Sequence, residues 1–215
     1  WFSYRKHVIT ASKGHEVKTR LATLKRSSEA GKINLEPLFE KIAGKSHGQS
    51  DLPALKYGRS MEGDAANVFL EVFRKSHKNV KMSECGLFLC EEMPYVGGSP
   101  DRMLQCSCCG NACLEIKCPF SIRHLAPDNP ESNLPYLKRE NNDLILKKTH
   151  KYYTQCQIQM VSAKVTRCYF FVWTPHGNIL QQIDFDQNFW LQVKSDLAEF
   201  YVNSYLPAYF AKKST

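Results

Sequence analysis

The stretch LEIKCPF, residues 114–120, places a carboxylate and an ammonium two positions apart in a short apolar run. Because the side chains of a strand alternate between its two faces, Glu115 and Lys117 would share one face and Leu114 and Ile116 the other. A proline then ends the run, since proline cannot donate to a sheet ladder. The pattern predicts a strand whose charged face either lies in water or lines a site.

A second carboxylate lies one predicted hairpin earlier, in the turn GGSPD at residues 97–101. Asp101 follows a predicted strand, so Asp101 and Glu115 can meet at the ends of neighbouring strands. Two carboxylates brought together in this way suit Mg²⁺, which binds one or two carboxylates and keeps several waters. Such an ion activates water and neutralises charge on a phosphodiester, while Lys117 polarises the nucleophile. The alternative is a surface hairpin with a cross-strand ion pair.

A Glu-x-Lys motif alone carries little information, and the chain contains a second copy at Glu16 and Lys18. That copy lies in a polar stretch, and no acid-bearing strand or turn precedes it. We interpret it as the solvated edge of a helix or loop. It serves as an internal control for the copy at residues 115–117.

The composition favours one intracellular domain spanning residues 1–215. Lys and Arg number 29 against 21 Asp and Glu, and the resulting charge of +8 favours an anionic partner such as nucleic acid. No apolar run has the length of a membrane span or a signal peptide, which points to the cytoplasm or nucleus. The nine cysteines are then expected to be thiols or metal ligands.

The order of predicted elements indicates an α/β or α+β fold around a central mixed sheet flanked by helices. Apolar spacing predicts helices over 34–44, 59–75, 150–164 and 186–210, the last broken near Pro207. Strands are predicted over 86–91, 112–117, 167–174 and 179–185. Residues 125–149, polar and rich in proline, are expected to form a long surface loop.

The SPD turn followed by EIKCPF resembles the core of the PD-(D/E)XK nucleases, specifically the lambda-exonuclease and YqaJ-like viral recombinase family. Three further blocks resemble that family in its order: Trp1, Arg5 and VITAS at 8–12; ALKYGRSMEGDA at 54–65; and YYTQCQIQM at 152–160. The resemblance covers most of residues 1–175. It implies a restriction-endonuclease-like core of the lambda-exonuclease type.

The resemblance also implies roles for individual residues. The metal ligands would be Asp101, Glu115 and the backbone carbonyl of Ile116, with Lys117 beside the attacking water. Glu62 would lie at the edge of the site as a ligand or as an organiser of Lys117. The pocket for a DNA 5′ phosphate would comprise Arg5, Ser12, Ser99 and Gln155, with Tyr152 and Gln157 as further DNA contacts.

A cysteine-rich hairpin at residues 103–113 departs from the sequence pattern of the lambda exonuclease. Cys106 and Cys109 have the spacing of a zinc-binding pair, and Cys113 or Cys118 could add further ligands. Adjacent Cys108 and Cys109 are not expected to bind the same ion, and no histidine lies near in sequence. Free thiols in a tight turn are therefore favoured over structural Zn²⁺.

The residues and the resemblance together predict a Mg²⁺-dependent deoxyribonuclease, with Mn²⁺ able to substitute. The expected activity is 5′ to 3′ exonucleolysis of double-stranded DNA ends that carry a 5′ phosphate. One alternative is an endonuclease or structure-specific nuclease of the same fold. Another is an inactive, zinc-stapled nucleic-acid-binding module. The sequence leaves a homo-oligomer open.

Overall fold

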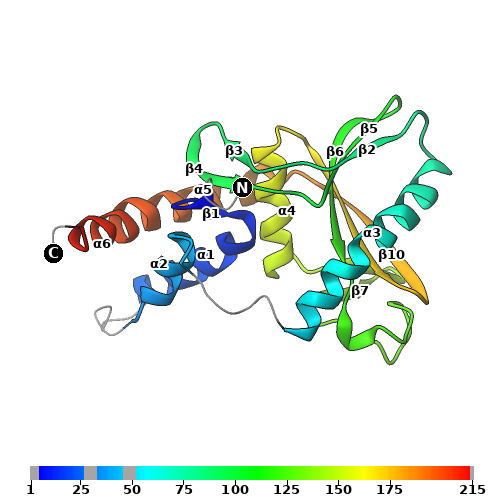
Figure 1. Ribbon diagram of the computed structural model, residues 1–215, viewed down its shortest axis with the longest axis horizontal. Coiled ribbons are helices and arrows are strands. Elements are labelled where there is room, and N and C mark those ends of the chain that lie inside the picture. Colours follow the sequence, from blue (N-terminus) through cyan, green and yellow to red (C-terminus); the bar gives the residue numbers. More distant parts are fainter. Residues whose placement is uncertain (1–4, 27–32, 46–51, 214–215) are drawn as a thin grey trace.

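A five-stranded mixed sheet forms the centre of the computed structural model, which describes residues 5–26, 33–45 and 52–213 (Figure 1). Its strand order is β10-β9-β6-β5-β2. All neighbouring strands are antiparallel except β6 and β9, which run parallel with Glu115 opposite Phe170. The strands are β2 (Lys81–Ser83), β5 (Arg102–Cys106), β6 (Gly110–Lys117), β9 (Arg167–Thr174) and β10 (Gly177–Asp184).

A smaller sheet of order β1-β4-β3 brings the N-terminal segment beside the strand that leads to Asp101. Its strands are β1 (Ile9–Thr10), β3 (Phe88–Cys90) and β4 (Met93–Gly98). β1 pairs in parallel with β4, with Thr10 opposite Gly97.

Two helices cover opposite faces of the central sheet (Figure 1). The helix α3 (Pro53–Arg74) packs Phe69 and Phe73 against the face that carries Leu114. The helix α4 (Lys151–Ser162) packs Cys156 and Met160 against the other face. The α4 helix also makes the connection between the parallel strands β6 and β9, as parallel pairing requires a crossover.

A third apolar cluster joins four of the remaining helices to the smaller sheet. These helices are α1 (Ala11–Arg26), α2 (Glu36–Ile42), α5 (Gln187–Phe200) and the π-helix η4 (Tyr201–Tyr205), which α6 (Leu206–Ala211) continues. The predicted break near Pro207 is instead a π-helical stretch just before it, and the chain stays helical through it (Figure 1). Proline lacks the N–H that a regular helix would use at this point, and the wider turn accommodates its ring.

The predicted loop over 125–149 is wrong in part, because it contains a hairpin of β7 (Leu137–Glu140) and β8 (Asp143–Leu146). Asn141 and Asn142 both have positive φ, 49° and 69°, as a two-residue hairpin turn requires. The hairpin follows a short 3₁₀ helix, η3 (Phe120–Ile122).

The second helix prediction starts too late, since α3 begins at Pro53 rather than at 59. Proline is well tolerated in the first turn of a helix, where its missing N–H has no intrahelical partner. Trp1, part of the first resemblance block, lies outside the described residues. Of the helices that the structure describes, none is long and apolar enough to cross a bilayer.

Candidate active site

The predicted two-faced strand is present as β6. Leu114 and Ile116 lie in the core beneath α3, whereas Glu115 points towards α4 and is only 1% exposed. A carboxylate buried to this degree requires polar partners, because burial of an unpaired charge is costly. The charged face of β6 therefore does not lie in bulk water.

Asp101 is fixed against β6 by two backbone hydrogen bonds. Its own N–H donates to the carbonyl of Leu114 (3.1 Å), and the N–H of Ile116 donates to Asp101 Oδ2 (2.7 Å). The turn at 97–101 thus delivers its carboxylate to the strand that carries Glu115. The predicted meeting of the two acids on neighbouring strands is present in the structure.

Three donors converge on Glu115. Lys117 Nζ and Gln155 Nε2 donate to Oε1, the latter at 2.6 Å, and Gln159 Nε2 donates to Oε2 at 2.7 Å. Each carboxylate oxygen can accept two hydrogen bonds, so Oε2 keeps one acceptor position for a ligand. Sequence reasoning missed Gln159, although it lies one helical turn after Gln155 and therefore on the same face of α4.

The electrostatics of the site reflect two acids close together. Burial and then the charge of Glu115 raise the pKa of Asp101 to about 8. Burial lowers the pKa of Lys117, but the attraction of Glu115 and Asp101 raises it by more, so the net direction is upward. Lys117 is therefore an ammonium at neutral pH and acts as a positive charge rather than as a base.

Glu62 reaches the same site from α3. With Asp101, Arg5 and Ser99 it lines a cavity of about 350 Å³. Its Oε1 accepts a hydrogen bond from Arg102 Nη1 at 2.8 Å. Arg102, which sequence reasoning also missed, donates to the backbone carbonyl of Asp101 as well (2.6 Å) and thereby joins α3 to the acid-bearing turn.

The four residues expected to bind a 5′ phosphate come from three segments. Arg5 and Ser99 line the cavity, and Ser12 is exposed in the first turn of α1. Gln155 instead donates to Glu115. The helices that carry Ser12 and Gln155 pack together.

The two further residues predicted to contact DNA, Tyr152 and Gln157, differ in their surroundings. Tyr152 lies under Lys117, whose Nζ is 4.5 Å from the centre of the ring. Gln157 is fully buried; its amide donates to the carbonyl of Asp184 (3.1 Å) and accepts from the N–H of Asp186 (2.9 Å). Gln157 therefore has a structural role here and no group directed to solvent.

The zinc ligands suggested by sequence do not converge. Cys113 lies in the core on the α4 side of the sheet, whereas Cys106 and Cys109 lie on the α3 side. Cys118 is beside the acids, where burial and then the charges of Glu62 and Asp101 raise its pKa to about 12. The predicted zinc site of Cys106, Cys109, Cys113 and Cys118 is therefore wrong. Cys106 and Cys109 instead lie beside Cys108 and His77.

The control copy of Glu-x-Lys behaves as expected for a helix edge. Glu16 and Lys18 lie on α1, and Glu16 forms a surface ion pair with Lys41 at 3.0 Å. Lys18 lies over the ring of Phe189. This pair has none of the buried acids that surround Lys117.

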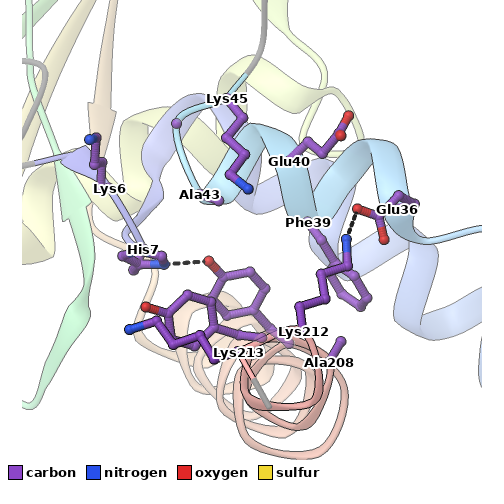
Figure 2. A pocket seen from close by; sticks show the side chains of 13 residues that line it. Lys6, His7, Glu36, Phe39, Glu40, Ala43, Lys45, Ala208, Lys212 and Lys213 are labelled. Carbon is purple, nitrogen blue, oxygen red and sulfur yellow. Dashed lines mark hydrogen bonds and ion pairs between the residues drawn. The ribbon is translucent and has the colours of Figure 1, made fainter. Parts of the chain in front are cut away.

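A second hollow of about 470 Å³ lies away from the acids, between α2 and α6 (Figure 2). His7 contacts the hydroxyl of Tyr205 at 2.6 Å, and Lys212 pairs with Glu36 across its mouth. None of the predicted site residues lines it.

A mixed sheet with an acid at the start of one strand and an acid and a lysine on the next defines the PD-(D/E)XK nuclease fold, as the sequence predicted. The chain matches the model of the YqaJ-like viral recombinase domain over residues 1–166 and belongs to that family.

Solved structures share this fold over nearly the whole chain. LHK-Exo in complex with dAMP is similar with a TM-score of 0.69 at 18% identity, over 100% of this chain and 96% of that chain. A further structure of this alkaline exonuclease, from Laribacter hongkongensis, gives 0.62 at 20% identity, over 99% and 97%. A SOX–DNA complex gives 0.51 at 13% identity, over 94% and 66%. No curated protein matches the chain.

Proposed function

We propose that the protein is a Mg²⁺-dependent deoxyribonuclease that degrades double-stranded DNA from its ends in the 5′ to 3′ direction. The observation that carries the proposal is the convergence of Asp101, Glu115 and Lys117 at neighbouring strands. Family membership and the fold of the solved exonucleases support the same activity.

The donor set fits a hard divalent cation. Asp101 Oδ2 is occupied by the Ile116 N–H, and within the described part of the chain no hydrogen bond reaches Oδ1. Glu115 Oε2 has one acceptor position left. Two such oxygens, in a site where burial and then the charge of Glu115 raise the pKa of Asp101, suit Mg²⁺. The chemistry that Mg²⁺ supplies when bound is a more acidic water and neutralisation of charge on the phosphate.

The residues of this chain would then hold and orient the reactants. Asp101 and Glu115 would be the ligands, together with the carbonyl of Ile116. The Lys117 ammonium, held between Glu115 and the face of Tyr152, orients the attacking water and offsets negative charge on the scissile phosphate. Glu62 fixes the position of the Asp101 turn through Arg102.

Preference for a 5′ phosphate would come from Arg5, Ser12 and Ser99. The guanidinium of Arg5 offers a planar fork of donors suited to phosphate. Lys13 adds positive charge nearby: burial and then Arg5 lower its pKa to about 8. An anion bound between these cations would relieve their repulsion.

The test is digestion of linear and circular duplex DNA with and without added Mg²⁺. We expect Mg²⁺-dependent loss of linear DNA only, with 5′-end label released first as mononucleotide. Asp101→Asn, Glu115→Gln and Lys117→Ala should abolish cleavage, whereas Glu16→Gln and Lys18→Ala in the control copy should retain it.

Cleavage by Glu115→Gln at the wild-type rate would contradict the site. Cutting of circular DNA would replace exonucleolysis by endonuclease activity. Arg5→Ala should slow digestion of 5′-phosphorylated ends more than of 5′-hydroxyl ends; equal loss on both would contradict the phosphate pocket.

A further inference from the structure

A cluster of three thiols and one imidazole lies at the end of the central sheet opposite the acids. It comprises His77, Cys106, Cys108 and Cys109, whose ligand atoms all lie within 4.8 Å of one another. His77 Nδ1 is 3.7, 3.3 and 3.4 Å from the sulfurs of Cys106, Cys108 and Cys109, respectively. Cys108 Sγ is 3.5 Å from Cys106 Sγ and 3.7 Å from Cys109 Sγ.

These separations match five of the six edges of a tetrahedron around one zinc ion, and the sixth, between the sulfurs of Cys106 and Cys109, is within 4.8 Å. With Zn–S bonds of about 2.3 Å and Zn–N bonds of about 2.05 Å, tetrahedral geometry places two sulfurs about 3.8 Å apart and a sulfur and nitrogen about 3.6 Å apart. Three cysteines and one histidine are a frequent ligand set of structural zinc. We propose that His77, Cys106, Cys108 and Cys109 bind one structural Zn²⁺ ion.

The local backbone presents the four ligands to one point. Cys106 ends β5 and Cys109 precedes β6, so both lie at the tip of a hairpin. Gly110, with φ of 75°, follows them in the turn. The sulfurs of adjacent Cys108 and Cys109 are 3.7 Å apart and both lie near His77 Nδ1, so their adjacency does not prevent them from sharing an ion.

The fourth ligand, His77, comes from the segment that follows α3, 29 residues before Cys106. The ring of His77 stacks on Phe73, with centroids 3.8 Å apart and planes within 9°, which fixes its orientation. The N–H of Ser107 donates to the carbonyl of Lys78 (3.0 Å) and holds the hairpin tip against this segment. His77 was missed by sequence reasoning because it is distant along the chain.

The ion would join α3 to the β5–β6 hairpin. Both elements also reach the acid cluster, through Glu62 near the middle of α3 and through Asp101 and Glu115 at the other end of the hairpin. A link at the hairpin tip therefore secures the helix on the sheet without contacting the reacting groups. The site is separate from the one proposed for Mg²⁺.

The experiment measures zinc by elemental analysis in protein that was expressed with zinc and desalted. All variants carry Asp101→Asn, which removes metal binding at the acid cluster. Failure of the zinc proposal is therefore distinguishable from failure of the nuclease proposal. We expect one zinc per chain, with at least a tenfold loss of zinc content in Cys108→Ser and His77→Ala. The matched controls Cys113→Ser and Cys118→Ser, drawn from the sequence-based set, and His124→Ala should retain it.

Loading of the wild-type chain with Co²⁺ in place of Zn²⁺ provides a second measurement, which does not depend on whether the variants fold. We expect the intense visible absorption of tetrahedral Co²⁺ with thiolate ligands, which added Zn²⁺ abolishes. Absence of both zinc and the cobalt spectrum would overturn the proposal. So would full zinc content in Cys108→Ser and His77→Ala.

Discussion

Glu115 is the residue on which the polar contacts of the acid cluster converge. Two glutamines of α4 and Lys117 hold its carboxylate, and the side chain is almost completely buried. Groups that orient a metal ligand typically change metal affinity or activity by about 10–100-fold when they are removed. Removal of Gln155 or Gln159 is therefore expected to change metal affinity or activity, although neither is itself a proposed metal ligand.

We predict that Gln159→Ala raises the Mg²⁺ concentration needed for half-maximal activity by about 10–100-fold, because Glu115 Oε2 loses its donor. Gln155→Ala should do the same and should slow digestion of 5′-phosphate and 5′-hydroxyl ends equally, as expected of a group bonded to Glu115. The measurement is a Mg²⁺ titration of rate on both kinds of end. A selective loss on 5′-phosphate ends would instead assign Gln155 to the phosphate pocket.

A second prediction concerns the pKa of Asp101, which the fold raises to about 8 from an ordinary value of about 3.9. Between these pH values the unfolded chain has lost the proton and the folded chain keeps it. Deprotonation therefore favours unfolding progressively from about pH 4 to pH 8, with no contribution below that range and the full penalty above it.

Asp101→Asn removes this penalty and keeps an oxygen for the Ile116 N–H. Without added divalent metal, we expect the variant to melt at least about 2–4 °C above wild type at pH 8.5, the shift that 1 kcal/mol gives in a chain of this size. At pH 4.5 the difference should largely vanish. Thermal melts at the two pH values measure it, and an equal difference at both would contradict the assignment.

At the scale of elements, β4 and α4 approach so closely that only glycine fits between them. A Cβ on Gly98 would lie 2.8 Å from the Cα of Gln159, whereas a Cβ on Gly63 in α3 would meet nothing within 4 Å. Overpacking of a tight contact typically costs about 1–3 kcal/mol. Glycine inside a helix is less stable than alanine by about 0.5–1 kcal/mol.

We therefore predict that Gly98→Ala lowers the free energy of unfolding by about 1–3 kcal/mol and that Gly63→Ala raises it by about 0.5–1 kcal/mol. Urea unfolding of the two variants measures both. Gly98→Ala should also weaken Mg²⁺ binding, since displacement of Gln159 releases Glu115. Equal free energies of unfolding for Gly98→Ala and wild type would show that β4 and α4 leave room for a methyl group at this position.

The sequence could predict those features that leave a pattern in neighbouring residues. The two faces of β6 follow from strict alternation, and the family and fold follow from four blocks in order. The β7–β8 hairpin was missed because its turn, Asn141–Asn142, lies in a polar, proline-bearing stretch that resembles a loop. Arg102, Gln159 and His77 were missed because their roles depend on partners far away in the chain.

At the scale of the whole molecule, the parallel pair β6–β9 joins the acid-bearing strand to a segment that follows the family match. The match ends at residue 166, and β9 begins at Arg167. β9 is almost completely buried, with Phe170 and Phe171 inaccessible on opposite faces of the sheet. Both of the clusters that enclose β6 therefore require residues beyond the match.

We predict that a fragment of residues 1–166 does not fold cooperatively, as expected if residues 1–215 form one domain. Without β9, β6 would have an unpaired edge and both apolar clusters would be open to water. Near-ultraviolet circular dichroism and a thermal melt of the fragment test this. A cooperative melt of residues 1–166 would place a domain boundary at its end.

The position of β9 after the acid cluster in the sequence also determines when during synthesis the site can form. Ribosomes release the chain from its N-terminus, so all residues proposed for DNA hydrolysis are made before the strand that fixes β6 in place. A nascent nuclease would thus carry its full set of reactive groups and still be harmless to the nucleic acid around it. Activity would begin only after β9 has left the ribosome, and a chain broken off before β9 would never become an enzyme.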